Sequence, residues 1–210
     1  MESFVHHFEP ATDPAARVTL LMLHGTGGNE LDLLPLGQRL APGAALLSPR
    51  GQVLERGMPR FFRRLAEGVF DLDDLRARTI GLADWVEAMT REKQIDPSRL
   101  VAVGFSNGAN IAASLLLMRP SVIAGAVLLS PMVPFEPEQP PKLAGKSVLI
   151  VYGRHDPLAP PEQPRRLGEI LASGGADVKI VETDEGHAIA ISSLPTISEW
   201  LKSLERSQTP

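Results

Sequence analysis

The sequence has 210 residues, of which 43% are hydrophobic and 22% charged, and this composition predicts a single ordinary domain over residues 1–210. The formal net charge is -4 and the only dense basic cluster is Arg60, Arg63 and Arg64, so nucleic acid is not expected as a partner. The absence of cysteine excludes disulfides, thiolate metal sites and a cysteine nucleophile. The N-terminal segment has neither a basic start nor an apolar core of signal-peptide length, and no apolar run approaches the length of a membrane span, so we expect a cytoplasmic protein.

Short apolar segments alternate with helical stretches along the chain. An edge strand is expected at residues 4–8, and further strands at 18–23, 44–47, 100–104, 124–129, 147–152 and 177–182. Helices are expected at 71–93, 109–118, 162–171 and 193–204, and the proline-rich 131–141 predicts an irregular connection. This alternation predicts the α/β class, with a mainly parallel sheet of about six to seven strands, helices on both faces and no large lid domain.

The expected helix at 71–93 has a recurring apolar face. Its apolar residues at helical spacing are Leu75, Leu82, Trp85, Val86 and Met89. We expect this face to be buried against the sheet.

A serine lies between two glycines at a strand-to-helix junction. The motif Gly104-Phe105-Ser106-Asn107-Gly108 directly follows an apolar strand candidate and opens the expected helix at 109–118. Glycines at both ends leave room where a Cβ would clash with the strand or the helix, so the turn can lift the Ser106 hydroxyl clear of the sheet. Ser106 is therefore the candidate nucleophile.

Other chemically capable residues follow other strand candidates, where open parallel sheets bind their ligands. Asp156 follows the strand at 147–152 and His187 the strand at 177–182. An imidazole can remove the hydroxyl proton of Ser106, and a carboxylate can fix the tautomer of the ring. The glycine-rich segment after the first parallel strand contains Thr26, whose N–H is a candidate oxyanion donor together with that of Asn107.

Three other residues compete for these roles. His24 is expected to brace the glycine-rich loop, because the strand end holds it beside the oxyanion site and not opposite the serine. His155 adjoins Asp156, and neighbouring side chains on an extended segment point to opposite sides, so we expect it at the surface or beside the site without a direct role. Asp184 is a local alternative to Asp156, and we expect it to be exposed.

With these motifs in order, the chain resembles the phospholipase/carboxylesterase family of α/β hydrolases, which includes small bacterial carboxylesterases and acyl-protein thioesterases. The resemblance rests on residues 23–28, 48–51, 104–108, 153–157 and 186–187. It implies Ser106 as nucleophile, Asp156 as orienting acid and His187 as base, with the amides of Thr26 and Asn107 as the oxyanion hole. Many relatives have glutamine where Asn107 stands, and the thioesterase branch has a tryptophan-centred motif near residues 60–63.

The expected function is a serine carboxylesterase that acts on a small-molecule ester with a short acyl chain, without metal or cofactor. Phe61 and Phe62 are candidate substrate-binding residues, and the alternative for them and for Phe70 is the plain core. For Arg60, Arg63 and Arg64 we expect a solvated face, and the alternatives are an anion contact in the cleft or a homodimer contact. Acyl thioesterase, lysophospholipase and a non-catalytic small-molecule receptor remain alternative functions.

Overall fold

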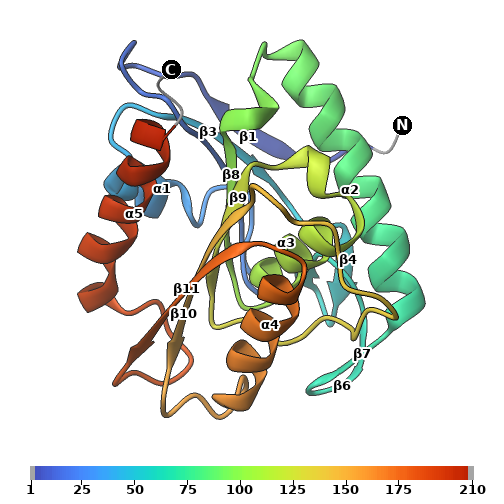
Figure 1. The fold of residues 1–210 in the computed structure, drawn as a ribbon. Helices are drawn as coiled ribbons and strands as arrows, with labels where there is room; N and C mark the ends of the chain where they lie inside the picture. The colour runs from blue at the N-terminus through green and yellow to red at the C-terminus, as the bar shows by residue number, and fades with distance from the viewer. Residues whose placement is uncertain (1–2, 208–210) are drawn as a thin grey trace.

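A central seven-stranded sheet organises the molecule, and the computed structural model describes residues 3–207 (Figure 1). The strand order is β1-β3-β2-β8-β9-β10-β11. These strands are β1 (His6–Glu9), β2 (Thr19–Leu23), β3 (Ala45–Pro49), β8 (Leu100–Phe105), β9 (Gly125–Leu129), β10 (Ser147–Gly153) and β11 (Asp177–Thr183). All neighbours pair in parallel except the edge strand β1, which is antiparallel to β3. The predicted strands, including the edge strand, are confirmed.

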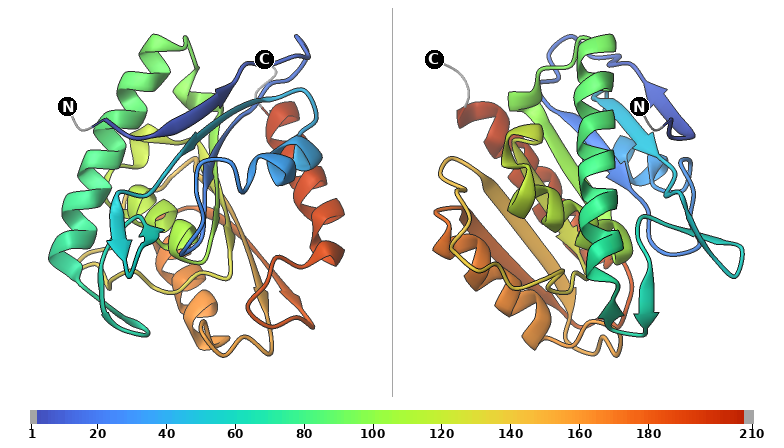
Figure 2. Two further views of the ribbon diagram at one scale, coloured as in Figure 1. Left: turned by 180° about the vertical axis from the view of Figure 1, so that it is seen from behind. Right: turned by 90° about the vertical axis from the view of Figure 1, so that its right-hand side faces the viewer.

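Helices cover both faces of this sheet, as expected (Figures 1 and 2). The helices α2 (Leu72–Glu92), α3 (Asn107–Met118) and α4 (Glu162–Ser173) enclose one core. On the opposite face, α1 (Leu34–Leu40) and α5 (Leu194–Ser207) enclose a second core. The central strands are therefore buried on both faces, which explains why they read as continuous apolar runs.

The apolar face predicted for the long helix is buried against the sheet. Leu75, Leu82, Trp85, Val86 and Met89 are each at most 5% exposed. The helix begins after Asp71, whose side chain accepts a hydrogen bond from the N–H of Asp74 and so caps a free donor. Within the described residues, no helix combines the length and the apolarity needed to cross a membrane.

Two small hairpins lie between β3 and α2, near the first turns of α2 (Figure 2). The first pairs β4 (Val53–Glu55) with β5 (Met58–Arg60), and the second pairs β6 (Arg64–Ala66) with β7 (Val69–Phe70). Arg56 and Gly57 connect β4 to β5 with positive φ angles of 51° and 81°, as in a two-residue hairpin turn. Residues 131–141 form no helix or strand, as predicted.

Candidate active site

Ser106 lies at the sharp turn between β8 and α3. Its φ of 53° and ψ of -114° place a residue with a Cβ in the left-handed half of backbone space, where strain is found at functional sites. The flanking glycines allow the close backbone contacts that this turn requires. A Cβ on Gly108 would overlap the carbonyl oxygen of Leu23, and one on Gly104 would overlap the backbone of Gly108. The fold therefore requires glycine on both sides of this serine.

The structure brings the three predicted side chains into one hydrogen-bonded chain. His187 Nε2 lies 2.8 Å from Ser106 Oγ, and His187 Nδ1 lies 2.7 Å from Asp156 Oδ2. The other carboxylate oxygen of Asp156 accepts the N–H groups of Leu158 at 2.8 Å and Ala159 at 2.9 Å. The Asp156 side chain is fully buried and that of His187 is 18% exposed. Such an arrangement can carry a proton from the hydroxyl to the imidazole and stabilise the resulting positive charge.

The three competing residues occupy other positions. His24 is buried under the glycine-rich loop, where its Nε2 accepts the N–H of Gly51 at 2.9 Å and its Nδ1 lies 2.7 Å from Gly25 O. Burial lowers the pKa of His24, so its ring is neutral and braces the loop. His155 is exposed. Asp184 is 79% exposed and pairs with Arg154 at 2.9 Å.

The two predicted oxyanion donors border the same cavity as Ser106. Asn107 is the first residue of α3, so its N–H belongs to the amides at a helix start that have no partner within the helix. Thr26 lies in the loop after β2, next to Gly27 with a φ of 85°. Both residues therefore lie where their N–H groups can serve an oxygen bound beside Ser106.

Residues 59–61, at the end of the first hairpin, form hydrogen bonds with both the glycine-rich loop and the serine turn. The carbonyl of Pro59 accepts the N–H of Gly27 at 2.9 Å. Arg60 Nη1 donates to Thr26 Oγ1 at 2.9 Å. The N–H of Phe61 donates to the side-chain oxygen of Asn107 at 2.7 Å. Residues 59–61 thus fasten the glycine-rich loop to the serine turn.

The cavity beside Ser106 has a volume of about 320 Å³ and a mixed lining. Its apolar part comes from Phe70, Phe105, Met132, Leu158 and Ala159. Its polar part comes from Thr26, Arg60, Arg64, Glu67, Asn107, Asn110, Ser130 and His187. This size and this mixture of surfaces suit a small molecule with both apolar and polar groups.

Phe61 and Phe62, expected as substrate-binding candidates, lie in the hydrophobic core. They are 3% and 0% exposed, and neither borders the cavity. Phe61 packs on His24 with ring centroids 4.8 Å apart, and Phe62 packs edge-on against Phe70 at 5.2 Å. Phe70 is therefore the aromatic residue of this segment that reaches the cavity, and the core alternative holds for the other two.

Arg60 departs from the expected solvated face. Its side chain is only 4% exposed, although that of Arg63 is 62% exposed. Sequence reasoning missed this burial, and it also missed Glu55, which pairs with Arg60 at 3.1 Å and Arg64 at 2.9 Å. Burial and the nearby charge of Arg64 lower the pKa of Arg60. The cluster of arginines in the sequence indicated this region, but the neighbouring residues do not reveal which arginine side chain is buried.

Comparison with known proteins identifies the family of this chain. The family model described as Phospholipase/Carboxylesterase matches residues 72–205, which include Ser106, Asp156 and His187. The chain belongs to the phospholipase/carboxylesterase family. Family membership places it among the ester hydrolases, and the fold is that of an α/β hydrolase.

Individual relatives align with most of this chain. It is 48% identical to MhqD of Bacillus subtilis (strain 168), which is named as a candidate hydrolase, over 87% of this chain and 92% of that protein. The crystal structure of the Bacillus cereus carboxylesterase is 44% identical with a TM-score of 0.92, over 96% of this chain and 94% of that one. The structure of YahD with malic acid is 28% identical with a TM-score of 0.89, over 96% and 100%.

Proposed function

We propose that this chain is a serine carboxylesterase that hydrolyses short-chain esters through an acyl-enzyme on Ser106. The observation that carries the proposal is the continuous contact from Ser106 Oγ through both ring nitrogens of His187 to buried Asp156. The same three residues are the ones that the family motifs assign to nucleophile, base and orienting acid.

The proposed reaction has two halves. Ser106 Oγ attacks the ester carbonyl while His187 Nε2 takes its proton, and the carbonyl oxygen accepts the N–H groups of Thr26 and Asn107. His187 then gives the proton to the leaving alcohol as the ester C–O bond breaks. In the second half, water attacks the acyl group with His187 as base, which releases the acid and restores the Ser106 hydroxyl. Asp156 holds Nδ1–H throughout, so that Nε2 is free to accept.

The cavity supports a short acyl group over a long one. Its apolar wall can bury a few methylene groups, each contributing about 0.8 kcal/mol, and a longer chain would gain nothing once it projects into water. The relative YahD is known in a structure with malic acid, a small dicarboxylic acid, which also favours small ligands for this chain.

A homologous series of nitrophenyl esters tests this function, with a matched thioester at each acyl length. We expect kcat/KM to be highest at about two to six acyl carbons and to fall for longer chains. We expect Ser106→Ala to retain the fold by circular dichroism and to lose about 10⁴-fold or more of the activity. Rising efficiency through long-chain esters, or a consistent preference for thioesters, would contradict the short-ester assignment. Saturable binding without product would instead support a receptor.

A further inference from the structure

Two arginines in the wall of the cavity beside Ser106 share one carboxylate. Glu55 accepts the Nε and Nη2 groups of Arg64 at 2.9 to 3.1 Å, and it also pairs with Arg60 Nη1 at 3.1 Å. Both arginines border the same cavity as Ser106. The cluster formed by Glu55, Arg60 and Arg64 therefore has two cations and one anion.

Each arginine keeps a nitrogen that the protein does not use. Arg60 Nε donates to the carbonyl of Phe62. Arg60 Nη1 donates to Thr26 Oγ1 and pairs with Glu55. Over residues 3–207, neither Arg60 Nη2 nor Arg64 Nη1 has a hydrogen bond, and neither is among the buried side-chain atoms that lack a partner. Both nitrogens therefore reach an accessible surface, and a guanidinium edge is a donor suited to a carboxylate.

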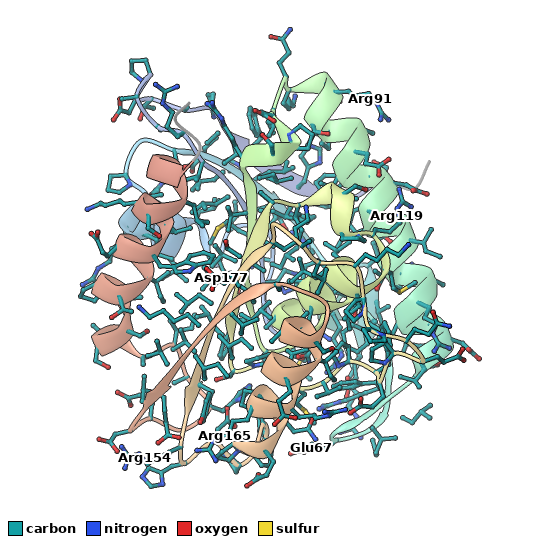
Figure 3. All side chains as sticks on the ribbon, in the orientation of Figure 1. Glu67, Arg91, Arg119, Arg154, Arg165 and Asp177 are labelled. Carbon is teal, nitrogen blue, oxygen red and sulfur yellow. The ribbon has the colours of Figure 1, made fainter. Side chains whose placement is uncertain are left out.

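With two cations and one anion, this cluster has an excess of positive charge beside the cavity. The side chain of Arg60 is 4% exposed, and the neighbouring cation of Arg64 adds to the effect of burial in lowering its pKa. Hydrogen bonds from Arg64 lower the pKa of Glu55, which stays an anion. A second carboxylate, that of Glu67, borders the cavity itself and is exposed in the turn between β6 and β7, in the lower part of Figure 3. Solvent screens an exposed charge more strongly than a buried one.

The cluster also lies next to the position proposed for the reacting carbonyl. Arg60 Nη1 donates to the side chain of Thr26, whose own N–H is the proposed oxyanion donor. The apolar part of the lining comes from other residues, chiefly Phe70, Met132 and Leu158. An ester bound at Ser106 can therefore meet a cationic surface and an apolar surface at once.

We propose that this site selects esters that carry a carboxylate a short distance from the scissile bond, and that Arg60 Nη2 and Arg64 Nη1 bind this carboxylate. The substrate class is the half-ester of a short dicarboxylic acid or the acyl derivative of a short hydroxy acid. The second carboxylate is bound but not consumed, so the reaction remains addition of water across the ester bond. This inference rests on the proposed esterase function and adds its specificity.

Isosteric pairs of substrates isolate the charge. Monomethyl succinate is compared with methyl succinamate, and acetoxyacetate with acetoxyacetamide, so that an amide replaces the carboxylate in the acid or in the alcohol part. Hydrolysis is followed by acid release at constant pH. In wild type we expect kcat/KM to be about tenfold or more higher for the anionic member of at least one pair, as for a charge-assisted hydrogen bond.

Variants then assign the preference to the cluster. Arg64→Gln should bring the anionic-to-neutral ratio of kcat/KM close to one, and Arg64→Lys should keep part of it because the charge remains. The matched control is Arg63→Gln, because Arg63 is 62% exposed, pairs with Asp71 and does not border the cavity. This control should retain the ratio. Arg64 is the better target than Arg60, whose removal would leave Thr26 and buried groups unpaired.

The outcomes separate this inference from the esterase proposal. A wild-type ratio near one in both pairs, or a ratio that Arg64→Gln leaves unchanged, overturns the proposed anion selectivity. If all four esters and the nitrophenyl esters go unhydrolysed, the proposed function fails. If nitrophenyl and neutral esters are hydrolysed without any charge preference, only the selectivity fails.

Discussion

Asp156→Asn tests the proposed proton relay with almost no change of shape. Asp156 Oδ1 accepts two backbone N–H groups, at 2.8 and 2.9 Å from Leu158 and Ala159. An amide nitrogen cannot accept them, so the asparagine oxygen must take this position and its NH₂ must face His187. The NH₂ would then donate to Nδ1, which places the ring proton on Nε2. A ring protonated at Nε2 cannot accept the proton of Ser106.

The expected loss is large in activity and small in stability. The wrong tautomer of a catalytic histidine costs about 10⁴-fold in kcat, which corresponds to about 5.4 kcal/mol of transition-state stabilisation. The amide fills the same space and keeps both backbone hydrogen bonds, so the free energy of unfolding should change by about 1 kcal/mol. Initial rates with a short nitrophenyl ester and urea denaturation measure the two effects. Asp184→Asn is the control, because Asp184 is 79% exposed. Activity of Asp156→Asn within about tenfold of wild type would refute the tautomer argument.

Three further changes probe the neighbourhood of the relay. His187→Ala should lose about 10³-fold or more of kcat, whereas His155→Ala should keep near-wild-type rates; the opposite pattern in the same ester assay would reverse the base assignment. Gly108→Ala places a Cβ against the carbonyl oxygen of Leu23, so it should lower the free energy of unfolding by about 3 kcal/mol or more, and an unchanged denaturation midpoint would contradict the close approach. Burial lowers the pKa of His24, so the unfolded chain binds the proton more readily and stability should decline as pH falls below about 6.5; a His24→Gln variant with the same pH slope of unfolding would exclude this origin.

The catalytic candidates could be predicted because their signals are local. A serine between Gly104 and Gly108 marks a turn that other residues cannot form, and the structure shows the backbone contacts that enforce it. Asp156 and His187 each follow a strand, and parallel strands end at a common edge of the sheet. Local sequence therefore determined which side chains meet, although not the distances between them.

The segment between β3 and α2 could not be predicted in the same way. The burial of Arg60 depends on Thr26 and Glu55, and the first of these lies 34 residues away in the sequence. Phe61 and Phe62 were candidates for the pocket because an aromatic side chain can line a pocket, although aromatic residues near helices more often pack in the core. Helix α1 was not predicted because it has only seven residues and contains Gly37, which weakens a helical pattern. Tertiary contacts decide these features.

Covalent labelling tests most directly whether Ser106 is the nucleophile. The protein is treated with a serine-directed fluorophosphonate, and its intact mass, its labelled peptide and its residual esterase activity are measured together. We expect one adduct per chain, on Ser106, formed in proportion to the loss of activity and absent from Ser106→Ala. We also expect slower labelling of His187→Ala, because the base that activates the hydroxyl is gone. Complete inactivation with the adduct on another residue, or full labelling of Ser106 with activity intact, would contradict the assignment of Ser106 as the nucleophile.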